Sequence, residues 1–154
     1  MKKSEKYKNV NAEIMAVIAG ETSLTARMAT MACLLHHQFE HFFWTGFYCV
    51  DPLKRDELVI GPYQGSLGCL RIPFGKGVCG ASAKARQTLI VDDVHNFPGH
   101  IACDHRSNSE IVVPVIDNNK LIAVLDIDST MLAAFDHDDK IWLERICTEL
   151  VSRA

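Results

Sequence analysis

Apolar side chains recur at helical spacing near both ends of this 154-residue chain. Residues 6–19 carry them three and four positions apart, and Gly20 ends the pattern, so we expect a helix there. A second helix is expected from a Thr22 or Ser23 cap to about residue 39, because one apolar stripe runs along it. A third follows the acidic turn at residues 135–139 and continues toward the C-terminus. Each pattern is amphipathic, which predicts a helix that buries one face.

An aromatic-rich strand is expected at residues 43–50, just after the second helix. Alternation along this strand places Trp44 and Tyr48 on the same face. Residues 57–60 should pair back on it as a hairpin, and residues 61–68 then read as a loop rich in Gly and Pro. Two interpretations stay open for the aromatic pair: a wall of a ligand pocket, or ordinary core packing.

Residues 74–80 resemble a glycine-rich turn that leads into a helix up to about residue 86. A phosphate-binding loop is a weak alternative here, because the segment lacks the Lys-Ser/Thr ending of the Walker pattern. Asn118 and Asn119 suit a tight hairpin turn, since Asn tolerates positive φ. Further strands are expected at residues 88–91, 111–116 and 121–127.

Composition narrows the classes of protein that fit. Apolar residues make up 48% of the chain, so we expect one domain with a sizeable core over residues 1–154. The net charge is −3, and no Lys/Arg cluster is interleaved with aromatics, which argues against a nucleic-acid partner. No apolar run is long enough to span a bilayer, and the N-terminus shows no signal-peptide h-region. We therefore expect no membrane partner, a cytoplasmic location, and a small molecule or a protein as partner.

The six cysteines differ in their surroundings. Without a signal peptide, a secreted disulfide framework is a weak interpretation, so each cysteine is a candidate core residue, metal ligand or redox thiol. Cys33 and Cys147 lie within apolar helical stripes and are expected to pack there. Cys79 lies at a helix start, where the helix dipole should lower the pKa of a thiol. Cys103 lies in a small-residue loop among His, Asp and Arg, which favours a nucleophilic thiolate over an ordinary exposed thiol.

Acidic side chains gather where two strands meet. Asp126 and Asp128 share one face at a strand end, where buried carboxylates need a ligand or partners. Glu110 precedes the neighbouring strand, and a regular two-residue hairpin would place it opposite Ile127, turned away from both aspartates. All three acids can share a site only if a bulge, another loop length or a displaced Glu110 changes that register.

A zinc site is an alternative use of the residue types around the reactive loop. No CxxC pair or zinc-ribbon spacing supports it, so we expect neither a metal nor another cofactor. The residues concerned are Cys69, Cys79, His100, Cys103 and His105.

Four runs of sequence, at residues 78–80, 99–104, 109–114 and 125–129, together resemble the free methionine-(R)-sulfoxide reductases. These are stand-alone GAF-domain enzymes. The resemblance covers nearly the whole chain, and its three cysteines are more specific than a general GAF pattern. It implies an α+β, GAF-like fold with a central antiparallel sheet of about six strands, flanked by helices. It also implies a ligand cavity on one face of the sheet and, as often in the family, a homodimer.

The resemblance implies a thiol-dependent reduction of free L-methionine-(R)-sulfoxide to L-methionine. Cys103 would attack the sulfoxide sulfur and become a sulfenic acid, which Cys69 or Cys79 then converts to a disulfide. Cys69 is favoured as this resolving thiol, with Cys79 as an alternate or relay thiol. Thioredoxin would reduce the disulfide. The R stereochemistry rests on the resemblance alone, since separate enzymes serve each sulfoxide epimer.

The resemblance also assigns residues to the substrate. An aromatic wall would lie against its methyl group, and Glu110 or Asp128 would protonate the sulfoxide oxygen. A carboxyl kept neutral by burial beside another acid can donate a proton in this way. The other carboxylates would bind the substrate ammonium, and loop N–H groups near Cys103 its carboxylate. The residues implied in binding are Trp44, Tyr48, Ile101, Ala102, Glu110, Asp126 and Asp128.

A GAF sensor module that binds a cyclic nucleotide or a similar small ligand, without catalysis, is the alternative from another class. Such modules are usually fused to an output domain, and we expect none in this chain. Three cysteines in or beside glycine-rich loops also have no evident use in a passive binder. Reduction of free methionine sulfoxide separates the two hypotheses.

Overall fold

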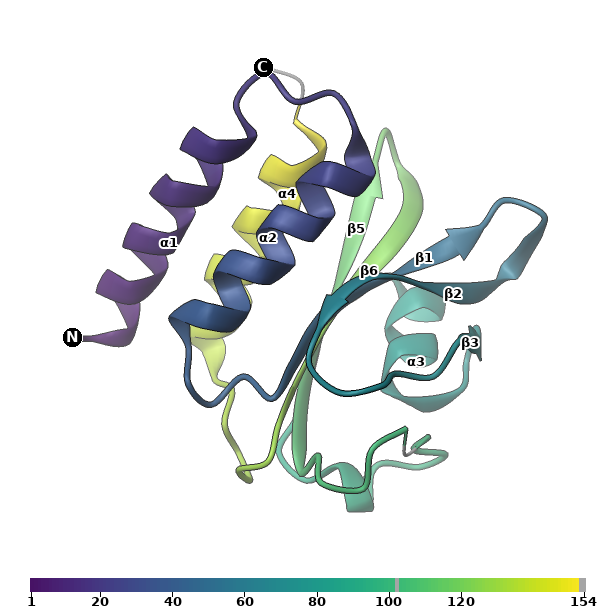
Figure 1. Cartoon of the computed structure of the whole chain (residues 1–154). Coiled ribbons are helices and arrows are strands. Elements are labelled where there is room, and N and C mark those ends of the chain that lie inside the picture. Colours follow the sequence, from purple (N-terminus) through teal and green to yellow (C-terminus); the bar gives the residue numbers. More distant parts are fainter. Residues whose placement is uncertain (102, 153–154) are drawn as a thin grey trace.

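Six antiparallel strands form one curled sheet, in the order β3-β2-β1-β6-β5-β4 (Figure 1). The computed structural model describes residues 1–101 and 103–152. The α+β, GAF-like fold that the resemblance implied is confirmed. The strands are β1 (Trp44–Asp51), β2 (Lys54–Gln64), β3 (Arg71–Pro73), β4 (Leu89–Val91), β5 (Ser109–Asp117) and β6 (Lys120–Ser129). The helices are α1 (Lys3–Ile18), α2 (Leu24–Gln38), α3 (Gly77–Ala85), α4 (His137–Val151) and the short 3-10 helix η1 (Val94–Asn96).

Helices α1, α2 and α4 cover one face of the sheet (Figure 1). Their apolar stripes bury side chains such as Ile14, Leu35 and Ile146, as the sequence pattern predicted. These side chains meet Phe47 and Ile127 from the sheet. Full burial of one such side chain stabilises the fold by about 1.5–3 kcal/mol, so this larger of the two cores holds the helical layer on the sheet.

The opposite face of the sheet carries α3, β3 and the loops beside them (Figure 1). Trp44 and Tyr48 pack in this smaller core, whereas Phe47 between them packs in the helical core. The predicted alternation along β1 is therefore confirmed. The two aromatic rings face the side of the sheet where loops, and not helices, form most of the cover.

Strand β2 is longer than expected, because the sequence predicted a strand at residues 57–60 and a loop at residues 61–68. Gly61 and Pro62 lie between the paired residues Ile60 and Tyr63, where the register with β1 shifts. A bulge tolerates proline, since its residues need not all donate to the ladder. The loop prediction was wrong for residues 61–64, because Gly61 and Pro62 were taken as turn signals where they mark a bulge, and it is confirmed for residues 65–68.

A bulge also sets the register of the β5–β6 hairpin. Asn118 and Asn119 form its turn with φ of 50° and 65°, as their tolerance of positive φ predicted. The pairing then shifts by one residue next to Val115, so that Glu110 lies opposite Asp128. Of the arrangements considered from sequence, the bulge is the one found. Because side chains alternate along a strand, it places all three acids on one face.

Helix starts follow the predicted caps. The Ser23 hydroxyl accepts from the Ala26 N–H at 3.2 Å, and Asp136 forms a capping box with Asp139 at the start of α4. Helix α1 begins three residues earlier than expected, where the Lys3 ammonium pairs with both Asp136 and Asp139. None of the helices in the described ranges is both long and apolar enough to cross a membrane.

Asp139 joins the N-terminal parts of α1 and α4 through a buried network. Its carboxylate accepts from the Tyr7 hydroxyl at 2.6 Å, and from the Lys3 ammonium and the Asp136 N–H at 2.8 Å each. We expect Asp139→Ala to lower the free energy of unfolding by about 3 kcal/mol, because it leaves buried donors without an acceptor. Urea unfolding measures the change, with exposed Asp138→Ala as the control at about 0.5 kcal/mol. Equal effects of the two variants would contradict this role.

Candidate active site

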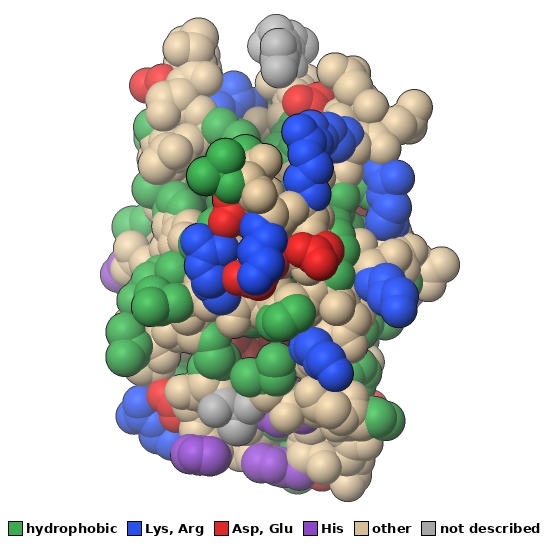
Figure 2. Space-filling model, turned by 90° about the vertical axis from the view of Figure 1, so that its right-hand side faces the viewer, with side chains coloured by type: hydrophobic (Ala, Val, Ile, Leu, Met, Phe, Trp, Pro, Cys, Tyr) green, Lys and Arg blue, Asp and Glu red, His purple; other side chains and the backbone are tan. Residues whose placement is uncertain are grey.

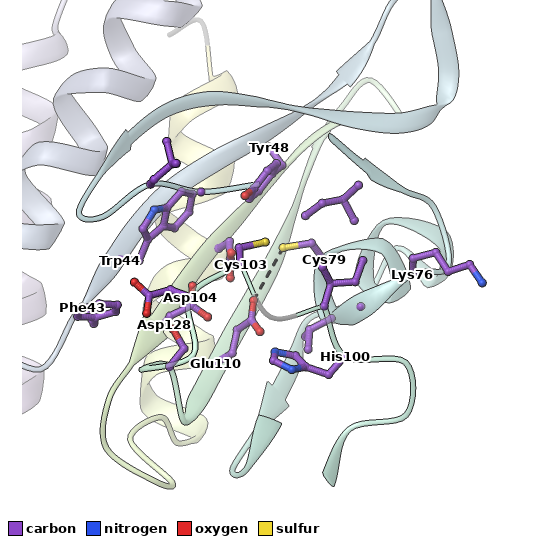
Figure 3. Close-up of a pocket in the computed structure, with 18 residues that line it drawn as sticks. Phe43, Trp44, Tyr48, Lys76, Cys79, His100, Cys103, Asp104, Glu110 and Asp128 are labelled. Carbon is purple, nitrogen blue, oxygen red and sulfur yellow. Dashed lines mark hydrogen bonds between the residues drawn. The ribbon is translucent and has the colours of Figure 1, made fainter. Parts of the chain in front are cut away.

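A cavity opens on the α3 side of the sheet, where β1, β5 and β6 meet α3 and two loops (Figure 3). The sheet supplies aromatic and acidic side chains to it. The loop between η1 and β5, residues 97–108, supplies Cys103, which a disulfide joins to Cys69 in the loop between β2 and β3, residues 65–70. Figure 2 shows the opening as a hollow between hydrophobic side chains, with acidic side chains at its base. Acidic side chains thus lie inside the cavity, and hydrophobic side chains surround its opening.

Three carboxyl groups lie together at the base of the cavity. Glu110 and Asp126 are only 6% and 5% exposed, and Asp128 is half-buried. Burial raises the pKa of all three. The charge of Asp126 raises the pKa of Glu110 and Asp128 further. Within the described residues, Asp126 Oδ1 has no hydrogen-bond partner. Glu110 and Asp126 therefore have little contact with solvent, and one Asp126 oxygen has no hydrogen-bond partner.

The three acids differ in how readily they ionise. Burial raises the pKa of Asp126 as well, but hydrogen bonds from Glu110 and Cys79 offset part of that rise. Glu110 and Asp128 are shifted further upward. In a coupled cluster the first proton leaves the group whose anion is best stabilised, here Asp126. The arrangement can thus hold one negative charge beside carboxyl groups that keep their protons.

A disulfide joins Cys69 and Cys103 across the two loops, with their Cα atoms 5.3 Å apart. Cys103 is exposed and Cys69 half-buried. The resemblance implied a link from Cys103 to either Cys69 or Cys79, and the structure has the first. This position gives the pair access both to the cavity, which Cys103 lines, and to solvent.

Cys79, which also lines the cavity, is a buried free thiol. Its Sγ donates to Glu110 Oε2 at 3.9 Å, the dashed line in Figure 3. Burial raises the pKa of this thiol, and the charges of Asp126 and Glu110 raise it further. The expectation that the dipole of α3 lowers the Cys79 pKa was therefore wrong. Desolvation and three nearby acids outweigh the partial charge of a helix terminus.

The aromatic pair forms one wall of the cavity. The Trp44 and Tyr48 rings stack with centroids 5.6 Å apart, and both line the cavity (Figure 3). Tyr63 stacks on Trp44 at 5.1 Å. The Trp44 Nε1–H donates to the Ser66 carbonyl at 2.8 Å, which fixes the ring. Both interpretations left open from sequence hold at once, since the rings belong to a core and face a cavity.

Most residues singled out from sequence converge on the cavity. Ile101 lines it, whereas Ala102 lies outside the described residues. Cys33 is half-buried and Cys147 is buried in the helical core, as expected. Other lining side chains had no role in the proposed reaction assigned from sequence. They include Phe43 and Lys76, and also His100 and Asp104 of the Cys103 loop, of which His100 was considered only for the alternative zinc site.

The alternative zinc set is not assembled, because the sulfurs of Cys69 and Cys103 are bonded to each other. In the described ranges, Cys79, Glu110 and Asp126 offer ligand atoms within 4.8 Å of one another. A cation bound there would first have to displace protons from groups whose pKa values are raised.

Comparison with known proteins agrees with this geometry. The GAF domain family matches residues 13–153. The chain is 45% identical to the free methionine-R-sulfoxide reductase of Escherichia coli (strain K12), over 97% of this chain and 89% of that protein. It is 41% identical to the free methionine-R-sulfoxide reductase of Saccharomyces cerevisiae, over 82% of this chain and 73% of that protein. The solved structure of free methionine-R-sulfoxide reductase from Neisseria meningitidis, in complex with its substrate, superposes with a TM-score of 0.93. That pair is 45% identical and covers 97% of this chain and 89% of that chain.

The sheet with its two unequal cores, and a cavity lined by one cysteine of a disulfide, define a GAF domain that carries a thiol redox site. The similarity extends over nearly the whole chain and includes all of the cavity. The chain belongs to the free methionine-R-sulfoxide reductases, a family of GAF-domain proteins. This confirms the resemblance seen in four short runs of its sequence.

The buried acids should make stability depend on pH. A carboxyl whose pKa is raised by folding stabilises the protein fully only below its unfolded pKa, and that contribution is lost as the pH rises through the folded pKa. We therefore expect Glu110→Gln to gain stability relative to the parent at about pH 8 and to gain less at about pH 4. Urea unfolding at both pH values measures this, with exposed Glu13→Gln as the control. A difference that is independent of pH would contradict the assignment.

Proposed function

We propose that this chain reduces free L-methionine-(R)-sulfoxide to L-methionine, with Cys103 as the nucleophile and Cys69 as the resolving thiol. The observation that carries the proposal is the Cys69–Cys103 disulfide at the mouth of a cavity whose base is acidic. Similarity to proteins named for this activity supports it, with 45% identity over 97% of the chain. A passive sensor would have no use for a thiol pair at this position.

The first step transfers the sulfoxide oxygen to a cysteine. The Cys103 thiolate attacks the sulfoxide sulfur, and Glu110 or Asp128 protonates the oxygen, which leaves poorly without a proton. The oxygen, now a hydroxyl group, bonds to the Cys103 sulfur as its bond to the methionine sulfur and the transient S–S bond break, so methionine leaves with its sulfur reduced and Cys103 is left as a sulfenic acid. The raised pKa of both carboxyls supports this role, because it favours the protonated form that can donate to the oxygen.

The second step forms the disulfide and releases water. The Cys69 sulfur attacks the sulfenic sulfur of Cys103, the S–O bond breaks, and the departing hydroxide takes a proton. Cys79 is less suited to this step, because its raised pKa keeps it a thiol that hydrogen bonds Glu110. We assign Cys79 to holding the acid cluster, with a relay role as the alternative.

Selectivity for the free amino acid follows from its two charged ends. Asp126, whose Oδ1 lacks a partner in the described structure, is our choice for the substrate ammonium. Backbone N–H groups of the loop that contains Ile101 and Ala102 would bind the carboxylate. Trp44 and Tyr48 would contact the methyl group. Methionine within a protein has neither free end, so it would leave Asp126 buried and uncompensated.

Thioredoxin is our proposed reductant, and a homodimer of single domains spanning residues 1–154 is the proposed assembly. A thiol–disulfide exchange partner must reach the Cys69–Cys103 bond, and the exposure of Cys103 supports such access. The other four cysteines are free, which fits a reducing compartment such as the cytoplasm.

Cys103→Ser should abolish turnover. We expect the reduction of free methionine-(R)-sulfoxide with dithiothreitol to fall about a thousandfold or more, because serine offers no comparable nucleophile. Chromatography of the methionine formed measures this, with Cys33→Ser on the far helical layer as the control. Full activity of Cys103→Ser would overturn the nucleophile assignment, and a parent that binds a cyclic nucleotide but forms no methionine would support the sensor hypothesis.

Cys69→Ser should separate the two steps. Reduced enzyme without added thiol should still form about one equivalent of methionine, because Cys103 accepts the oxygen unaided. Dimedone should then trap the persistent sulfenic acid on Cys103, and turnover with thioredoxin should fall at least about tenfold. Peptide mapping and a thioredoxin-coupled assay measure both outcomes. Unchanged turnover, or a disulfide from Cys103 to Cys79 in the parent, would contradict the role of Cys69.

A further inference from the structure

A polar bridge joins the same two loops as the disulfide. The Ser66 hydroxyl donates to Asp104 Oδ2 at 2.8 Å. Ser66 lies three residues before Cys69, and Asp104 directly follows Cys103. The bridge therefore crosses between the loops beside the redox pair, although neither of its residues reacts.

Both ends of the bridge are anchored on the start of β1. The Ser66 carbonyl accepts from the Trp44 Nε1–H at 2.8 Å. On the other loop, the Arg106 guanidinium donates twice to Asp104, at 2.7 and 3.0 Å, and lies over the Phe43 ring at 4.8 Å. Figure 3 shows Asp104 on the side of the cavity where Phe43 and Trp44 lie. Two adjacent residues, Phe43 just before β1 and Trp44 at its first position, thus hold one loop each.

Asp104 is held in its charged form, in contrast to Glu110 and Asp128. Hydrogen bonds from the Arg106 side chain and backbone and from Ser66 hold the pKa of its carboxyl far below the ordinary value. The neighbouring acids of the cluster are shifted the opposite way. The Ser66 hydroxyl therefore meets a full carboxylate, and hydrogen bonds to charged groups are stronger than neutral ones.

The disulfide breaks in every catalytic cycle, so it cannot by itself keep the loops together. The sheet fixes the start of the loop at residues 65–70, because Gln64 pairs with Thr45, and the end of the loop at residues 97–108, because Ser109 pairs with Ser129. Within the two loops the described residues form no helix or strand. When the sulfurs separate, the bridge is a remaining link between the loops beside the pair.

We propose that the Ser66–Asp104 bridge positions Cys69 for attack on the oxidised Cys103, which makes Ser66 and Asp104 positioning residues of the reaction. This role rests on the proposed function. The step it serves is balanced: Cys69 thiol and Cys103 sulfenic acid give the disulfide and one water. The bridge and the disulfide are present together in the structure, and coupling between two links is reciprocal: if the disulfide holds the loops where the bridge forms, the bridge must favour the disulfide by the same factor.

The deciding experiment needs no sulfoxide. Reduced protein is equilibrated with glutathione and its disulfide, where the protein dithiol and oxidised glutathione exchange to the protein disulfide and two glutathione thiols. Ser66→Ala should lower the equilibrium constant for the Cys69–Cys103 disulfide about fivefold, the effect of one partly exposed hydrogen bond to a carboxylate. Alkylation and mass spectrometry measure the fraction oxidised. An unchanged constant in this variant would overturn the proposal.

Matched variants separate the bridge from general damage to the loops. Ser66→Thr keeps the hydroxyl and should restore the parent constant, whereas exposed His105→Ala on the same loop should leave it unchanged. Asp104→Asn should act in the same direction as Ser66→Ala, and the double variant should be no worse than the stronger single one. Additive losses, or a loss in His105→Ala equal to that in Ser66→Ala, would contradict a specific bridge.

A single-turnover experiment then tests the positioning role. Reduced Ser66→Ala mixed with free methionine-(R)-sulfoxide should release methionine within about twofold of the parent rate, while dimedone traps at least about fivefold more sulfenic acid on Cys103. Slower methionine release in Ser66→Ala, without extra sulfenic acid on Cys103, would contradict the role in disulfide formation. If the parent forms no methionine, yet Ser66→Ala still has a lower equilibrium constant with glutathione than the parent, the proposed function is refuted, whereas the effect of the bridge on the disulfide is supported.

Discussion

The site of this protein depends on three carboxyl groups, two buried and one half-buried, that lie on one face of a sheet. A buried carboxylate without partners is far more costly than a core side chain is stabilising, so each group must hold a proton, a partner or a ligand. Burial raises the pKa of Glu110 and Asp128 and so favours their protonated forms, and Asp126 keeps an oxygen without a partner in the described structure. The fold gathers them through one bulge in the β5–β6 hairpin, which places Glu110 opposite Asp128.

The same acids explain how the thiols are divided. A thiol buried beside them is held protonated, as Cys79 is, so a thiolate nucleophile is better placed where solvent reaches it. Cys103, the proposed nucleophile, is exposed on a loop that lines the cavity, and a disulfide joins it to Cys69 on a second loop. Loops lack the hydrogen-bonded pairing that fixes neighbouring strands relative to each other. In this protein a hydrogen bond from Ser66 to Asp104 brings two such loops together.

Sequence patterns predicted the helices, the alternation along β1 and the turn at Asn118 and Asn119 because these depend on local spacing and φ preference. They did not decide the hairpin register, since a bulge depends on packing along the whole of both strands. Cys79 was misjudged for a related reason: its helix position is local, whereas its burial against acids from β5 and β6 is tertiary. The resemblance to a known family indicated that distant cysteines come together, which no spacing along the chain could show.

The account stands on the claim that burial keeps a carboxyl protonated at neutral pH within reach of the reactive sulfur. Infrared difference spectroscopy of the reduced protein measures this directly, because a protonated carboxyl has a C=O stretching band separate from the carboxylate bands. The account predicts such a band at about pH 7, lost or shifted in Glu110→Gln and in Asp128→Asn. A spectrum that shows only carboxylate bands in the parent at that pH would contradict it.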